Sequence, residues 1–70
     1  MTIKEIWDFI TVEQRKELQA AVMMDGVSAT TAYMYLTGQS KPLKLYKESI
    51  ARHVRDIVDL DVPVAELFRV

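Results

Sequence analysis

Side chains that commonly act in catalysis or bind metal ions are scarce in this sequence. Cysteine is absent and His53 is the single histidine, which excludes thiolate zinc sites and cysteine nucleophiles from this chain. No partner is grouped around His53, so we expect a surface or half-buried residue rather than a metal ligand or a general base. Asp56, Asp59 and Asp61 lack the glycine and the spacing of a calcium-binding loop. We therefore predict that the protein is not an enzyme, and no metal, cofactor or small-molecule substrate is evident.

The remaining chemical signal is positive charge in the middle of the chain. The formal net charge is −1, which by itself argues against a nucleic-acid ligand. Residues 28–55 nevertheless carry five lysines and arginines against Glu48 alone, whereas residues 1–27 and 56–70 are both acidic. Because charges are screened over about 10 Å, a polyanion responds to a local patch rather than to the total charge.

Lys41 and Lys44 are the better candidates for contacts with phosphate groups. No carboxylate precedes them locally, and unopposed positive charge favours a polyanionic partner. Arg52 and Arg55 are better explained as members of a solvated helix face with Glu48 and Asp56, which lie at i,i+4 spacing from Arg52.

Length and composition indicate one folded domain over residues 1–70. A chain of 70 residues with 50% hydrophobic and 27% charged residues is too apolar for intrinsic disorder and too short for two cores. The longest apolar run, residues 20–24, is far shorter than the roughly 20 residues of a membrane helix. The N-terminus has no pattern of a signal peptide, and the lack of cysteine fits a reducing compartment. We expect a cytoplasmic protein.

Capping signals and helix-breaking residues divide the chain into helices. Thr2 and Thr11 each begin a capping box, with Glu5 and Gln14 three residues later. No alternation typical of strands is present. The pattern predicts an all-α fold, a compact bundle of four to five helices. The expected elements are a short helix after Thr2, helices over residues 12–24 and 28–37, a helix with Pro42 in its first turn, and a short turn that starts at Pro63.

Apolar residues at helical spacing predict which faces are buried. Each expected helix has one such face, so a single core is expected. The predicted core residues are Ile3, Ile6, Trp7, Ile10, Leu18, Ala21, Val22, Met24, Ala32, Tyr35, Leu36, Leu43, Tyr46, Ile50, Val54, Ile57, Leu67 and Phe68.

Residues 26–42 read GVSATTAYMYLTGQSKP. A glycine–hydrophobic–serine turn, a helix, and then glycine, a basic residue and proline make this stretch resemble the phage-repressor-type (Cro-like, lambda-repressor-like) helix-turn-helix. The resemblance covers about 17 residues strongly and implies a motif over about residues 12–37. In that family the first helix of the motif is followed by a recognition helix, here residues 28–37, which enters the major groove.

The resemblance also implies which residues touch DNA. The outward face of the recognition helix carries no Arg, Asn, Gln or Lys, the usual readers of bases, so we expect weak or A·T-leaning readout. The residues implied to face bases are Ala29, Thr30, Tyr33 and Met34. Those implied to contact phosphate are Ser28, Thr37, Ser40, Lys41 and Lys44.

Two functions remain open from the sequence. The first is a sequence-directed transcriptional regulator that binds double-stranded DNA, with a homodimer expected because one such module makes a small interface. The alternative is a protein–protein interaction module on the same helices without nucleic acid. The uncharged recognition helix and the outward Tyr33 and Met34 favour it, because tyrosine and methionine are enriched at protein interfaces. DNA binding requires Lys41 and Lys44 to lie beside residues 28–33 on one surface.

Overall fold

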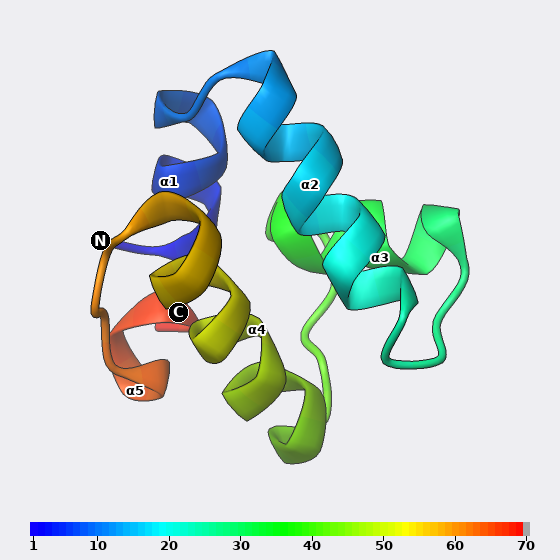
Figure 1. Cartoon of the computed structure of the whole chain (residues 1–70). Helices are drawn as coiled ribbons and strands as arrows, with labels where there is room; N and C mark the ends of the chain where they lie inside the picture. The colour runs from blue at the N-terminus through cyan, green and yellow to red at the C-terminus, as the bar shows by residue number, and fades with distance from the viewer. Residues whose placement is uncertain (70) are drawn as a thin grey trace.

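The computed structural model describes residues 1–69, and their regular structure consists of five α-helices with no strand (Figure 1). The all-α prediction is therefore confirmed. The helices are α1 (Ile3–Phe9), α2 (Val12–Met23), α3 (Ala29–Leu36), α4 (Lys44–Val58) and α5 (Val64–Leu67). None of them is long and apolar enough to cross a membrane.

The predicted capping boxes form at the start of α1 and α2. The Thr2 backbone N–H donates to the Glu5 carboxylate at 2.8 Å, and the Glu5 N–H donates to the Thr2 hydroxyl at 3.3 Å. Thr11 and Gln14 make the same reciprocal pair, with both distances 3.1 Å. Ser28 caps α3 by accepting from a backbone N–H in its first turn. Local sequence signals therefore determine where three of the helices begin.

The start of α4 differs from the prediction. Pro42 is not in its first turn: the helix begins at Lys44, and Leu43 is its N-cap, with an extended backbone and no side-chain cap. Pro42 lies just before the cap and is buried, so it packs the loop against the protein instead of opening the helix.

The buried residues form one cluster to which all five helices contribute. Every apolar position predicted on α1 is buried, as are the central positions of the other helices. In Figure 1, α3 passes behind α2, and α2 packs against both α3 and α4. The N-terminus lies beside α5, where the Met1 ammonium contacts the Glu66 carboxylate at 2.9 Å.

Two predicted core residues are wrong. Met24 is 88% exposed and Leu43 is 73% exposed. Leu43 is the N-cap of α4 and has an extended backbone, so its side chain does not follow the apolar face of that helix. Met24 is the C-cap of α2 and keeps a helical backbone, but it lies on the opposite side of that helix from Leu18 and Val22. Helical spacing is informative only within the helix that it assumes.

Candidate nucleic-acid interface

The start of α3 is fixed against α2 by a side chain that the sequence analysis did not select. The Gln19 side-chain amide of α2 donates to the backbone carbonyl of Ala29, the first residue of α3, at 3.0 Å. Ala29 and Thr30 lie exposed beside it. The only sequence signal for Gln19 was its position at the border of the apolar face formed by Leu18 and Val22.

The exposed face of α3 borders a shallow hollow of about 290 Å³, named here the α3 hollow, which is lined by Gln19, Ala29, Thr30 and Tyr33. Three of the four residues implied to face bases meet there, while Met34 is half-buried. An amide carries two N–H donors and a carbonyl acceptor, and Gln19 uses one N–H on Ala29. The hollow thus contains the kind of base-reading side chain that α3 itself lacks.

Tyr33 joins this hollow to a second one, the Trp7 hollow, of about 370 Å³. Its ring forms a T-shaped pair with the Trp7 ring, at a centroid distance of 5.9 Å and an interplanar angle of 86°. The second hollow is lined by Lys4, Trp7, Asp8, Arg15, Tyr33, Thr37 and Gln39.

Arg15 of α2 is held in place beside Tyr33. Its Nε–H donates to the Trp7 carbonyl at 2.8 Å, and its guanidinium lies over the Trp7 ring at 5.5 Å. Among residues 1–69, no carboxylate lies within 4.0 Å of it. The sequence did not single out Arg15, because the carboxylates of residues 1–27 outnumber the cations there, and the fold brings this one cation next to Tyr33 of α3.

Two hydroxyls implied to contact phosphate already donate within the chain. Ser28 donates to the hydroxyl of Thr31 at 3.0 Å, and Thr37 donates to the Tyr33 carbonyl at 2.7 Å. Thr37 also accepts from the Gln39 amide at 2.9 Å. A hydroxyl has a single proton to donate, so either residue would have to exchange its bond to serve a phosphate.

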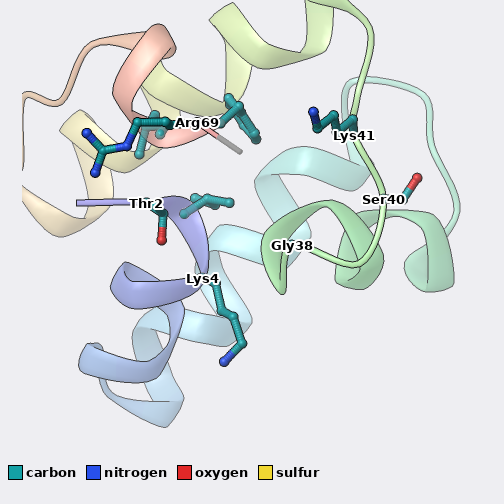
Figure 2. A pocket seen from close by; sticks show the side chains of 9 residues that line it. Thr2, Lys4, Gly38, Ser40, Lys41 and Arg69 are labelled. Atoms are coloured by element: carbon teal, nitrogen blue, oxygen red, sulfur yellow. The ribbon is translucent and has the colours of Figure 1, made fainter.

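Lys41 and Ser40 lie elsewhere, in a pocket shared with the start of α1 and the end of the described chain (Figure 2). Lys44 is exposed at the first turn of α4. Neither lysine lines the α3 hollow or the Trp7 hollow. The basic residue common to Figure 2 and the Trp7 hollow is Lys4, whose ammonium pairs with Asp8 at 3.0 Å. Lys41 and Lys44 therefore share no hollow with residues 28–33, although DNA binding was expected to place them on one surface, and the cations that line a hollow with Tyr33 are Arg15 and Lys4.

The arginines of α4 make fewer ion pairs than the sequence spacing suggests. Arg55 contacts its neighbour Asp56 at 3.6 Å. Within residues 1–69, Arg52 has no carboxylate within 4.0 Å, so the expected i,i+4 pairing does not form there.

His53 is half-buried, as predicted, but it has partners that lie far away in the sequence. The Ser49 hydroxyl donates to Asp25 Oδ2 at 2.6 Å, and His53 Nε2 lies 3.0 Å from the same oxygen. Burial opposes ionisation of the Asp25 carboxyl, but the hydrogen bonds from Ser49 and His53 outweigh it and hold its pKa below the usual value. This cluster, named here the Asp25 cluster, connects the α2–α3 turn to α4.

The site thus combines an exposed helix face with an amide on one side and an arginine held by a tryptophan on the other. These groups suit hydrogen bonds to base edges and charge-assisted bonds to phosphate. In comparisons with known proteins, no family model, no curated protein and no solved structure matches this chain.

Proposed function

We propose that the protein binds double-stranded DNA as a helix-turn-helix transcriptional regulator, with α2 and α3 as the motif and α3 in the major groove. The observation that supports this most is the bond between Gln19 and Ala29. It anchors the exposed start of α3 on α2 and leaves an amide in the same hollow as Thr30 and Tyr33.

The residues on this face suit A·T base pairs. A glutamine amide can bond to the N6 and N7 edge of adenine, and the methyl groups of Ala29 and Thr30 can contact the thymine methyl. Arg15 keeps N–H groups for phosphate beyond the one bonded to Trp7. No carboxylate occurs between Gly26 and Lys47. The recognition helix and the loop after it therefore have no acidic side chain that would repel the DNA phosphates.

A second copy of the protein belongs to this proposal. A single module of this kind buries roughly 600–1,000 Å² on DNA, which gives modest affinity. Two copies on adjacent half-sites, about 34–36 Å apart, would supply the rest.

Protein binding without DNA is the second candidate, favoured by the exposed apolar side chains. Phe9 and Val12 are exposed at the corner between α1 and α2, and Leu45 is 74% exposed in the first turn of α4. Single exposed apolar residues are ordinary, but several large ones on so small a domain favour an interaction surface.

The two candidates are separated by measuring binding to a library of random duplex DNA at low salt, followed by selection and fluorescence anisotropy. DNA binding predicts that the selected sites are rich in A·T and that Arg15→Gln weakens binding to every sequence. For the Arg15→Gln variant, the slope of log K for DNA binding against log salt concentration should become shallower by about 1.

Lys16→Gln is the matched control, since it removes the same charge from the next, exposed position of α2. Equal losses of DNA affinity in the Arg15→Gln and Lys16→Gln variants would mean that Arg15 has no particular role. Absence of any DNA binding by the unaltered protein would reject the proposal and leave the protein-binding candidate.

A further inference from the structure

A pocket of about 240 Å³ lies where the start of α1, the loop between α3 and α4, and the end of α5 meet (Figure 2). Its apolar part is made by Ile3, Leu67 and Phe68, of which the first two are buried in the core. Its polar lining residues are Thr2 and Ser40, whose hydroxyls point away from the pocket in Figure 2, together with three cationic residues. The cations are Lys4, Lys41 and Arg69.

Among residues 1–69, no carboxylate lines this pocket, and the carboxylates adjacent in the sequence to its lining residues are already engaged. Glu5 accepts the Thr2 backbone N–H in the capping box. Glu66 accepts from the Met1 ammonium at 2.9 Å. The field at the pocket is therefore set by its cations, which favours an anion.

The three cations are not equivalent. The Lys4 ammonium points away from the pocket in Figure 2 and is bonded to Asp8 at 3.0 Å. The Arg69 guanidinium also points away from the pocket, whereas the Lys41 side chain extends toward it, and within residues 1–69 neither has a carboxylate within 4.0 Å. Lys41 is therefore the cation that faces the pocket without a competing ion pair.

Gly38 keeps the wall of the pocket open. Its φ of +79° belongs to the left-handed region, and a Cβ built on it would lie 3.4 Å from the Lys4 Cβ. A side chain at this position would be strained and would occupy the space between α1 and the loop.

We propose that this pocket binds a small organic anion, a carboxylate or phosphate ester carried on an apolar or aromatic body. The apolar wall takes the body and the Lys41 ammonium takes the charge. The volume lies just below the roughly 300–1,000 Å³ of common ligand sites, so the ligand is of fragment size. The site lies apart from the α3 hollow and its ligand does not depend on DNA binding.

A phosphate of DNA could supply the same charge, so the test must show that the apolar body contributes. The probes are phenyl phosphate, inorganic phosphate and benzyl alcohol, titrated into the isotope-labelled full chain without DNA at constant ionic strength. Binding is followed by the backbone amide signals in two-dimensional NMR spectra.

The proposal predicts saturable shifts at the pocket residues and binding of phenyl phosphate about tenfold tighter than that of either control, a difference of about 1.4 kcal/mol. Equal binding of inorganic phosphate would show that the apolar wall has no role. Equal binding of benzyl alcohol would show that the cations have none. Either result, or no saturable shift at all, overturns the proposal.

Lys41→Gln should weaken the binding of phenyl phosphate at least several-fold, whereas Lys44→Gln should leave it nearly unchanged. Both lysines are exposed and three residues apart, and only Lys41 lines the pocket. Similar losses in both variants would indicate unspecific attraction and contradict the proposal. The amide spectrum of each variant reports directly whether the fold is retained.

Discussion

Replacing Ser49 by alanine tests whether the Asp25 cluster stabilises the position of the α2–α3 turn on α4. Ser49 is buried, and its hydroxyl donates to the Asp25 carboxylate at 2.6 Å. A hydrogen bond to a charged group contributes about 1.5–3 kcal/mol. Because the Asp25 side chain is 24% exposed and water can replace part of the bond, we expect a loss of about 1.5–2 kcal/mol. For a domain of this size that loss lowers Tm by about 6–16 °C.

The effect of Ser49→Ala should also depend on pH. The folded protein holds the pKa of Asp25 below its usual value of 3.8, so this carboxylate contributes stability above that pH. The contribution is lost as the pH falls through the lower pKa of the folded state. The difference in stability between the variant and the unaltered protein should therefore be largest near neutral pH and should shrink below pH 3.8.

Thermal unfolding followed by circular dichroism over a range of pH measures both quantities. Ser40→Ala is the matched control, since Ser40 is half-buried and only its backbone makes a hydrogen bond within residues 1–69. If Ser49→Ala and Ser40→Ala had the same Tm, or if their difference were constant down to strongly acidic pH, the Asp25 cluster would not stabilise the fold as argued.

Two further predictions concern the helices that carry the site. Leu36→Ala and Ile50→Ala should each lower the free energy of unfolding by about 2–5 kcal/mol because both side chains are fully buried; urea titration measures this, and the exposed Leu45→Ala should change little. Thr11→Ala removes the cap of α2 and should cost about 1 kcal/mol in the same assay. Thr30 is exposed in the first turn of α3, and Thr30→Ala should leave the free energy of unfolding within about 0.5 kcal/mol of that of the unaltered protein. If Thr30→Ala lowered it as much as Thr11→Ala, the capping argument would be contradicted.

Most of the fold follows from short-range signals in the sequence. The helix over residues 28–37 was predicted to within one residue at each end, because Ser28 caps its start and Gly38, with φ at +79°, follows its end. The start of α4 was wrong because no side chain caps it. Pro42 is buried just before that cap, and burial of a loop residue by the packed helices has no local signature in the sequence.

The side chains that surround α3 could not be predicted in the same way. Gln19 and Ala29 are ten residues apart, and Asp25 and His53 are 28 apart. Neither spacing is that of neighbours on one helix or in one turn. The two residues of each pair therefore come into contact only when the helices pack together. Arg15 could not be predicted for a related reason. The net charge of residues 1–27 describes a surface only if residues that are neighbours in the sequence lie on the same surface.

Trp7 gives α1 a role beyond filling the core. Trp7 is almost entirely buried, yet its ring packs at a right angle on Tyr33 of α3, and its carbonyl and ring hold Arg15 of α2. The relative positions of an aromatic side chain on α3 and a cation on α2 are therefore set by a third element. Because a buried tryptophan has little freedom to move, Tyr33 and Arg15 are ordered before any ligand arrives. A ligand that uses both then loses less conformational entropy on binding.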